Sequence, residues 1–354
     1  MQKNILVAPL NWGLGHATRC IPIIKALEEN DFTPILASDG DALAMLRKEF
    51  PHLKSLELPS YQIEYAKDGA DFKWKMLKSM PKMMESILDE KKIVKQWVKE
   101  FNLMGIISDN RLGVFSKKVS SVFITHQLNV LTGNTTWITS KLHQHIIKKF
   151  DECWVPDYED APNLTGKLGH LKTPIDHIKY IGPLSRLQKK ELPMRYDLMV
   201  ILSGPEPQRG MLERRLREQI DATQGKVVFI CGKMALQQSK IEIDNVTYYN
   251  FMTTEQLEQT FNESKMVLCR SGYTTIMDLA KLEKSAFFIP TPGQYEQEYL
   301  AKRLKKNGLF PFAKQEDFTF DKLMETDLYK KATLKNESIH WKNLFCLFER
   351  KGEF

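Results

Sequence analysis

Cysteine is scarce in this sequence, and its five copies are dispersed as Cys20, Cys153, Cys231, Cys269 and Cys346, with no CxxC pair. An odd, scattered set argues against a disulfide framework or a zinc site and is typical of reduced thiols in a cytoplasm. Continuous apolar runs of about 18 to 20 residues, the length that a membrane span needs, are also absent. A strand pattern begins within four residues of the start, so we expect no signal peptide and a cytoplasmic protein.

Two common phosphate-binding motifs are missing as well. Residues 11–19 read NWGLGHATR, directly after the apolar run 4–10. Gly13 and Gly15 match the start of the GxGxxG fingerprint, but Thr18 replaces its third glycine, and no GK[ST] follows. The loop still lies between a predicted strand and a predicted helix, where free N–H groups and the helix dipole favour an anion. His16 opens that helix, and by itself it is consistent with packing or with proton transfer.

The bulk composition is that of an ordinary globular protein with a basic balance. With 354 residues, 42% hydrophobic and 27% charged, the chain predicts about two domains. Its formal charge of +7 suits an anionic partner, such as a nucleotide or a phospholipid surface. Nucleic acid is not expected, because the lysine excess is concentrated in one stretch without a recognised nucleic-acid motif.

Short apolar runs alternate with amphipathic helical stretches, which predicts an α/β protein with parallel sheets and helices on both faces. The expected strands are 4–10, 33–38, 103–109, 121–126 and 151–157, then 196–204, 226–231, 245–251, 264–269 and 284–290. The pattern restarts after a charged segment that contains proline, so we place one doubly wound domain at 1–182 and another at 183–354. Ligands are expected in a cleft at the carboxyl ends of the two sheets. A helix within 336–351 closes the chain, and its packing back onto the first domain is left open.

Three loops of the second domain carry polar residues at predicted helix starts. Ser203 and Gly204 follow its first strand. The segment 269–283, CRSGYTTIMDLAKLE, places hydroxyls where a phosphate would bind, and Asp278 one turn later could accept hydrogen bonds from a ribose diol. The plain alternative is an N-capped helix with an exposed acid. In 287–304, amides and carboxylates that suit sugar hydroxyls, or simply a solvated acidic first turn, are Gln294, Glu296, Gln297 and Glu298.

The first domain has further polar strand ends and one unusual helix. Asp109, Asn110 and Arg111 could bind an acceptor or support His16, or they could be ordinary turn residues. For His126, which follows the next strand, a structural role is favoured. The segment 72–100 mixes eight lysines with four methionines and two tryptophans. It could lie on an anionic membrane or cover a core with soft side chains.

Together these segments resemble glycosyltransferase family 28, which includes MurG and the plant-type galactosyl-diacylglycerol synthases. Four motifs occur in the family's order over nearly the whole chain. They are the GxGH loop at 13–16, the SG loop at 203–204, CRSG at 269–272 with the later acid Asp278, and P…Q…QE…A within 287–304. The likeness is strongest over 267–304 and weakest over 61–100. It implies the GT-B fold, in which two Rossmann-like domains face a cleft and the second holds most of a nucleotide-sugar.

The resemblance assigns roles to particular residues. It implies His16 as a base or positioning residue, and Asp109 completes the predicted catalytic pair. Asp278 takes the position of the ribose-binding acid, which is usually glutamate in the family. Gln297 and Glu298 stand where MurG-like members have paired glutamines, so the donor sugar is left open. The remaining nucleotide-sugar residues are Gly13, Gly15, Ser203, Gly204, Arg270, Ser271, Gly272, Thr274, Thr275 and Gln294, with Phe251 and Met252 near the base.

The activity implied is inverting, metal-independent transfer of a hexosyl group from a UDP-sugar or a related donor to an acceptor hydroxyl. No cofactor besides the donor is expected. A lipid or cell-envelope acceptor, with peripheral contact at the inner face of the membrane through 72–100, is the corresponding partner hypothesis. Two alternatives remain from the residues alone: a nucleotide-sugar hydrolase or epimerase, and a nucleotide-sugar-binding protein without turnover.

Overall fold

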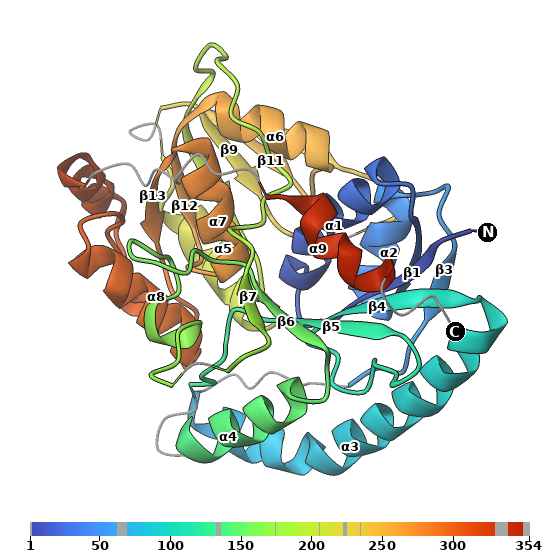
Figure 1. The fold of residues 1–354 in the computed structure, drawn as a ribbon. Coiled ribbons are helices and arrows are strands. Elements are labelled where there is room, and N and C mark those ends of the chain that lie inside the picture. The colour runs from blue at the N-terminus through green and yellow to red at the C-terminus, as the bar shows by residue number, and fades with distance from the viewer. Residues whose placement is uncertain are drawn as a thin grey trace. The chain divides into compact units, whose positions relative to one another are not determined.

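The computed structural model describes residues 2–61, 69–131, 136–173, 175–204, 206–221, 225–233, 235–329 and 339–349. For residues 69–80 it describes the backbone and not the side chains. The chain divides into two compact units (Figure 1). Unit 1 comprises Met1–Glu64, Met76–Leu184 and Asn336–Phe354, and unit 2 comprises Tyr65–Lys75 and Ser185–Lys335. The predicted cleft concerns the placement of one unit against the other, so it stays a prediction.

Unit 1 is built on a parallel sheet in the order β3-β2-β1-β4-β5-β6-β7. Its strands are β1 (Asn4–Pro9), β2 (Thr33–Ser38), β3 (Ser55–Glu57), β4 (Leu103–Asp109), β5 (Ser120–Ile124), β6 (Glu152–Val155) and β7 (Ile178–Tyr180). β1 pairs with β4 so that Pro9 lies opposite Asp109. The central strands are buried on both faces, as their continuous apolar sequences require.

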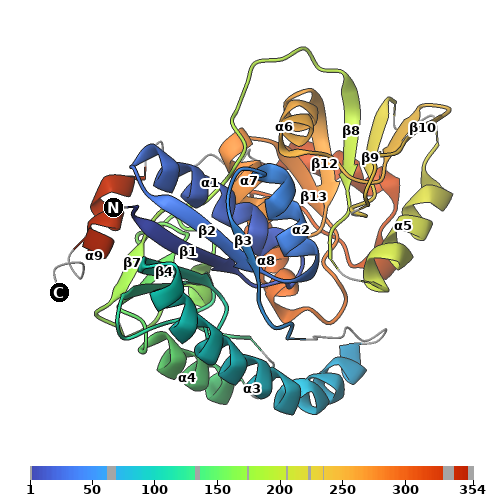
Figure 2. The same ribbon diagram turned by 90° about the vertical axis from the view of Figure 1, so that its right-hand side faces the viewer.

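Helices cover both faces of this sheet. The connections between the parallel strands place α1 (Gly15–Glu29) and α2 (Gly40–Glu49) on one face and α3 (Gly69–Glu100) and α4 (Thr136–Ile147) on the other (Figures 1 and 2). Val94 and Val98 of α3 pack in one core cluster with the strands, and Ile147 of α4 packs in another. Each helix thus returns the chain to the amino end of the next strand.

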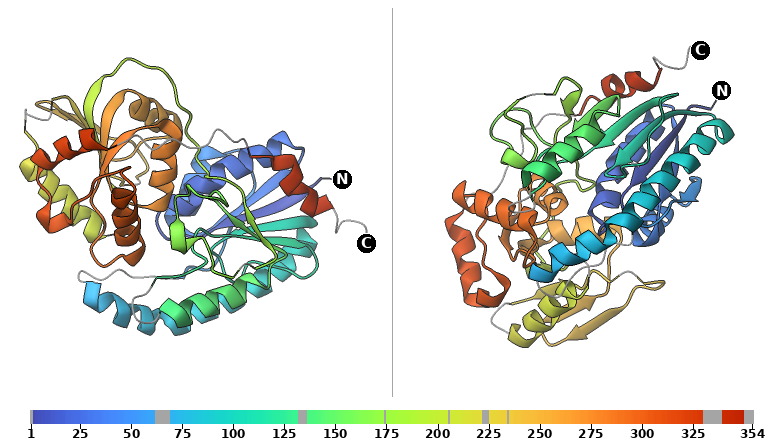
Figure 3. Two further views of the ribbon diagram at one scale, coloured as in Figure 1. Left: turned by 60° about the vertical axis from the view of Figure 1, so that its left-hand side comes forward. Right: turned by 90° about the horizontal axis from the view of Figure 1, so that it is seen from below.

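Helix α9 (Trp341–Glu349) belongs to unit 1, although unit 2 separates it from the rest of that unit in the sequence. Phe345 makes an edge contact with Phe32 at a ring-centroid distance of 5.7 Å, and Phe348 is fully buried. At Gly105 of β4, a Cβ atom would lie 2.2 Å from the Phe348 ring, so only glycine fits beneath the helix. Figure 3 shows α9, in red, near the blue N-terminal part of the chain.

Unit 2 repeats the doubly wound plan with the sheet order β10-β11-β9-β8-β12-β13. Its elements are β8 (Tyr196–Ile201), α5 (Gln208–Gln219), β9 (Val227–Ile230), β10 (Lys240–Ile243), β11 (Val246–Tyr249), α6 (Thr254–Asn262), β12 (Ser264–Cys269), α7 (Tyr273–Leu282), β13 (Ser285–Phe288) and α8 (Tyr295–Lys306). Leu212 and Leu216 of α5 join a core cluster with the sheet, while α6 and α7 cover the opposite face (Figure 2).

The predicted fold class, two doubly wound Rossmann-like domains, is confirmed in both units. The prediction of purely parallel sheets is wrong at one edge, because β10 pairs with β11 in the antiparallel direction. β10 reads KIEI and is exposed along its length, so it lacks the buried apolar run that marks a strand in sequence. Among the helices that the structure describes, none combines the length and the apolarity needed to cross a membrane.

Candidate active site

The candidate catalytic residues lie where the strand order of the unit 1 sheet reverses. From β1 the sheet grows in one direction through β2 and β3 and in the other through β4 and β5. The loops that leave β1 and β4 therefore separate, and this gap at the carboxyl edge is where open α/β sheets bind ligands. Gly13 (φ +74°) allows the sharp turn after β1, and Gly15 and His16 begin α1. Asp109 is the last residue of β4.

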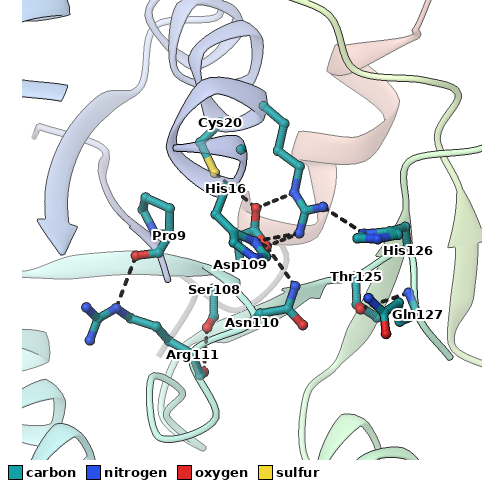
Figure 4. A network of polar contacts seen from close by, with 12 residues as sticks. Pro9, His16, Cys20, Ser108, Asp109, Asn110, Arg111, Thr125, His126 and Gln127 are labelled. Atoms are coloured by element: carbon teal, nitrogen blue, oxygen red, sulfur yellow. Dashed lines mark hydrogen bonds and ion pairs between the residues drawn. The ribbon is translucent and has the colours of Figure 1, made fainter. Parts of the chain in front are cut away.

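His16 and Asp109 form a hydrogen-bonded pair (Figure 4). The Nδ1 atom of His16 lies 2.9 Å from Oδ1 of Asp109, whose side chain is fully buried, whereas the His16 side chain keeps 14% of its surface exposed. If Nδ1 carries the proton that binds Asp109, Nε2 is left as an unprotonated base. This arrangement of a base and an orienting carboxylate is typical of general-base catalysis.

A third residue, Arg19, completes this cluster from the next turn of α1. Its Nε donates to Asp109 Oδ2 at 2.5 Å, and its Nη2 donates to Oδ1 of the same carboxylate. Nη2 also lies 2.9 Å from His16 Nδ1, and Nη1 donates to His126 Nδ1 at 2.8 Å. Our sequence reasoning missed Arg19 and favoured a structural role for His126. The signal was present in GHATR, because residues three apart on a helix share one face.

The charges of this cluster shift the pKa of its members in ways that suit a base. Burial lowers the pKa of His16, and Arg19 lowers it further, while Asp109 opposes both. Burial by itself would raise the pKa of Asp109, but Arg19 and His16 outweigh it and hold that pKa well below its usual value. At neutral pH the cluster therefore contains a carboxylate and a neutral imidazole.

Arg111, proposed from sequence as an acceptor ligand or a support for His16, has a different setting. It is fully buried, its Nη1 donates to Glu90 Oε1 of α3 at 2.7 Å, and its Nη2 pairs with Asp39. The Tyr61 hydroxyl donates to the same Glu90 carboxylate at 2.7 Å. Arg111 therefore ties α3 to the strand ends. Asn110 does reach the pair, because its Nδ2 donates to Asp109 Oδ1 at 3.1 Å.

In unit 2 the strand order reverses between β8 and β12, and the predicted SG and CRSG loops leave the sheet there. Ser203 and Gly204, with φ +94° at the glycine, follow β8. Gly272 precedes α7 with φ −70°, a value open to any residue, and a Cβ added there would meet no protein atom within 4 Å. Neither backbone nor packing thus demands this glycine, which is expected where a ligand approaches the chain closely.

The neighbours of Gly272 bind mainly the protein itself. Ser271 is buried, and its hydroxyl donates to the carbonyl oxygen of Gln297 at 2.8 Å. Arg270 is 1% exposed, and it donates to the carbonyls of Ile289 and Gln208 and to the Gln315 side chain. Both side chains fix the loops around the N-terminus of α7. Thr274 and Thr275 occupy its first turn and are partly exposed.

Asp278 lies one turn into α7 with 8% of its surface exposed. Its Oδ1 atom accepts a 2.6 Å hydrogen bond from the Ser185 hydroxyl. Burial raises the pKa of Asp278 to about 6, although Ser185 and Arg186 act in the opposite direction. The ionised form of Asp278 is therefore costly to keep buried, and such strained groups are typical of ligand-binding sites. Its role at the ribose stays a prediction.

The predicted sugar-binding residues at the start of α8 also form hydrogen bonds within their own loop. Gln297 Oε1 accepts from the backbone N–H of Thr291 at 2.8 Å, and Glu298 Oε1 accepts from that of Gly293 at 3.2 Å. Gln294 is the N-cap residue of α8. This loop follows β13, the neighbour of β12, so it lies at the same edge as the CRSG loop.

Phe251 and Met252 follow β11, further along the same edge. The Phe251 N–H donates to Asn250 Oδ1 at 2.9 Å, and its carbonyl accepts from Gln238 Nε2 at 2.7 Å. The Met252 sulfur accepts from the Thr260 hydroxyl at 3.4 Å. Their role at the base stays a prediction.

Comparison with known proteins finds a family domain in the second half of the chain. Residues 210–339 match the glycosyltransferase family 28 C-terminal domain. The UDP-N-acetylglucosamine--N-acetylmuramyl-(pentapeptide) pyrophosphoryl-undecaprenol N-acetylglucosamine transferase of Haemophilus ducreyi is 22% identical over 334 residues, covering 92% of this chain and 88% of that protein. Among solved structures, the glycotransferase of kitacinnamycin superposes with a TM-score of 0.61 at 13% identity, covering 99% of this chain and 96% of that one. MurG of Acinetobacter baumannii gives 0.53 at 12% identity, covering 99% and 94%.

These structures share the fold of this chain, and the family match falls on the unit that carries the SG, CRSG and PTPGQ loops. The order of those loops is the order from which the resemblance was inferred. Residues 210–339 thus carry a glycosyltransferase family 28 C-terminal domain, and the chain has the GT-B fold of these glycosyltransferases.

Proposed function

We propose that this protein transfers a hexosyl group from a UDP-sugar to a hydroxyl group of a lipid-linked acceptor, with inversion at the anomeric carbon. The observation that carries the proposal is the His16–Asp109 pair at the reversal point of the unit 1 sheet. A hydrolase or a binding protein would need no acceptor, and the named relative from Haemophilus ducreyi is a transferase whose acceptor is a pyrophosphoryl-undecaprenol.

In this proposal His16 acts as the general base. Its Nε2 atom takes the proton of the acceptor hydroxyl while the hydroxyl oxygen bonds to the anomeric carbon, and the bond from that carbon to the diphosphate oxygen breaks. Asp109 stabilises the imidazolium that forms. A positioned base of this kind contributes about 10² to 10⁴ in rate.

Unit 2 would hold the donor and stabilise the leaving group. UDP departs with added negative charge, and the backbone N–H groups in the first turn of α7 provide fixed positive ends of dipoles. The open space at Gly272 supports a close approach of the diphosphate. In this proposal the helix terminus serves in place of a metal ion, and Asp278 accepts hydrogen bonds from the ribose.

The membrane contact is proposed on two helices of unit 1. On α4 the exposed apolar residues are Trp137 (71%), Ile138 (60%) and Leu142 (58%), and exposed lysines follow at Lys148 and Lys149. Sequence reasoning interpreted this helix only as part of the alternating α/β pattern and did not see its exposed apolar face. A helix with apolar side chains beside basic ones suits the boundary of an anionic bilayer.

Helix α3 also carries exposed apolar residues followed by exposed lysines. Met84 and Leu88 are exposed by 52% and 51%, and exposed lysines follow at Lys92, Lys95 and Lys99. Part of the segment 72–100 that suggested membrane contact, residues 72–80, lies outside the described side chains. Helices between parallel strands run antiparallel to them, so the early turns of α4 point to the carboxyl edge that carries His16. A lipid-linked acceptor would thus be delivered near the base, at the cytoplasmic face of the membrane.

The test is a transfer assay with purified protein. Binding of UDP-hexoses and other nucleotide-sugars is first measured by calorimetry, and each labelled donor that binds is incubated with and without a lipid extract that contains polyprenyl-linked sugars. We expect label to enter the organic phase only when lipid is present, and only with His16 intact.

Each other outcome contradicts one part of the proposal. Release of free labelled sugar without lipid would favour a hydrolase, and conversion of the donor into an isomer would favour an epimerase. Label in a water-soluble product would exclude the lipid acceptor. Failure of every nucleotide to bind would remove the donor assignment in unit 2.

A further inference from the structure

We infer that Arg19 is a positioning residue for the base, which orients Asp109 against His16, places a positive charge beside the His16 ring and fixes the tautomer of His126. This inference rests on the proposed role of His16. It concerns a residue outside both predicted site sets, and it follows from contacts that Arg19 makes with three polar residues from three elements of unit 1.

The guanidinium group is placed to orient Asp109. It donates to both carboxylate oxygens, through Nε to Oδ2 and through Nη2 to Oδ1. A forked pair of this kind fixes the plane of the carboxylate as well as its distance. Because Asp109 Oδ1 is also the partner of His16 Nδ1, the plane that Arg19 sets determines where the imidazole ring can bind. Arg19 is 1% exposed, so water does not compete for these bonds.

Arg19 also balances the charge that His16 feels. The charged or titratable groups around the His16 ring are Asp109 at the end of β4, Arg19 on α1 and His126 after β5, and the Cys20 thiol contacts the same carboxylate at 3.7 Å. Asp109 alone would favour the imidazolium form. Burial of the ring opposes that form most strongly, and Arg19, with Nη2 2.9 Å from His16 Nδ1, opposes it further.

The contact with His126 has only one interpretation. Arginine carries donors and no acceptor, so the 2.8 Å contact makes His126 Nδ1 the acceptor. A neutral His126 must then carry its proton on Nε2. Arg19 thereby fixes the proton of His126 on Nε2, while His16 Nδ1 lies between the Asp109 carboxylate and the Arg19 guanidinium.

The test is a titration of the histidines that needs no substrate. Long-range ¹H–¹⁵N spectra of protein labelled at histidine report the pKa and the tautomer of each imidazole, and His16→Gln and His126→Gln assign the two signals. In Arg19→Met we expect the midpoint of His16 to rise by about one pH unit, because the positive charge beside the ring is lost while Asp109 remains. The acidic limb of the kcat/KM profile should move by the same amount.

Arg19→Lys is the matched variant, because it keeps the positive charge and loses the fork. We expect its acidic limb to stay near that of the wild type, while kcat falls about tenfold or more with little change in KM. The His126 signals should lose their Nε2–H pattern. If Arg19→Met fails to fold, Arg19→Lys decides on its own, since unchanged kcat and an unchanged His126 tautomer would overturn the inference.

A merely structural Arg19 predicts a different result. The variants would then melt at lower temperature, while the His16 midpoint and the acidic limb stayed where they are in the wild type. Because the spectra are recorded without donor or acceptor, this negative result is distinct from a failure of the proposed transfer reaction.

Discussion

The Nδ1 atom of His16 and the Oδ1 atom of Asp109 lie 2.9 Å apart, although 93 positions separate the residues in the chain. Pairing of β1 with β4 brings them together, since Pro9 at the end of β1 lies opposite Asp109. The contact within the predicted catalytic pair is thus a direct product of strand order.

His16→Ala should abolish transfer while leaving donor affinity intact, because the imidazole acts on the acceptor proton. We expect kcat to fall by about 10² to 10⁴. Product formation and calorimetric binding of UDP would be measured on the same preparation. A variant as active as the wild type would contradict the assignment of His16 as the base. A larger dissociation constant for UDP would place His16 at the donor instead.

Gly272→Ala should leave the fold intact and weaken the binding of donor. The backbone there suits alanine, and the new methyl group meets open space in the protein, so we expect stability within about 0.5 kcal/mol of the wild type. A methyl group in the path of the diphosphate should lower UDP affinity about tenfold, which corresponds to about 1.4 kcal/mol.

Gly232→Ala is the control for Gly272→Ala. Its φ is +66°, and a Cβ there would lie 2.2 Å from the Leu202 carbonyl oxygen, so unit 2 should be destabilised outright. Melting curves and UDP titrations of both variants separate the two effects. Unchanged UDP affinity in Gly272→Ala would mean that the open space is not the diphosphate site.

Asp278→Asn should stabilise the protein above pH 6 and weaken the binding of the donor. Because burial raises the pKa of Asp278 to about 6, the folded state binds its proton more tightly than the unfolded chain does. Stability should therefore fall as the pH rises from about 4 to 6, by about 3 kcal/mol at 1.36 kcal/mol per pKa unit. Asparagine keeps the acceptor for Ser185 and cannot ionise.

Urea unfolding of wild type and Asp278→Asn at pH 5 and 7.5, followed by UDP titration, checks this expectation. Equal pH dependence in the two proteins would contradict the raised pKa. A dissociation constant for UDP that does not change would refute the ribose role.

Trp137→Ser combined with Leu142→Ser should reduce binding to vesicles that contain anionic phospholipid. Each side chain is more than half exposed, so folding should not suffer, whereas burial of such a side chain in lipid contributes about 1.5 to 3 kcal/mol. We expect vesicle partitioning to fall at least about tenfold in co-sedimentation. Leu236→Ser, at a leucine of unit 2 that is 98% exposed, is the matched control. Equal losses of vesicle binding in the double variant and in Leu236→Ser would exclude a specific membrane-binding surface on α4.

The fold could be predicted because its central strands are short, buried and apolar, and the helices between them are amphipathic. β10 could not, because an exposed edge strand such as KIEI has no apolar run. At the site, positions after strand ends marked His16 and Asp109 as candidates. Arg19 escaped notice because a cation three residues along a helix usually faces solvent. Only the order β1-β4-β5 shows that it meets a carboxylate from one strand and a histidine after the next.

The apolar face of α4 shows a second limit of sequence patterns. Trp137, Ile138 and Leu142 have the spacing of residues that pack in a core, yet they are exposed, while Ile147 of the same helix is buried. A helical period says that apolar residues share a face. It does not say whether protein, lipid or water covers that face.

Helix α9 sets an order of events during synthesis on the ribosome. The strands and helices of unit 1 emerge first, but Phe345 and Phe348, which pack with Phe32 on that unit, follow only after all of unit 2 has been translated. All strands of the unit 2 sheet lie within 185–335, so this sheet can assemble as that stretch appears. The contacts of α9 with unit 1, which carries His16 and Asp109, therefore form only after unit 2 has been synthesised.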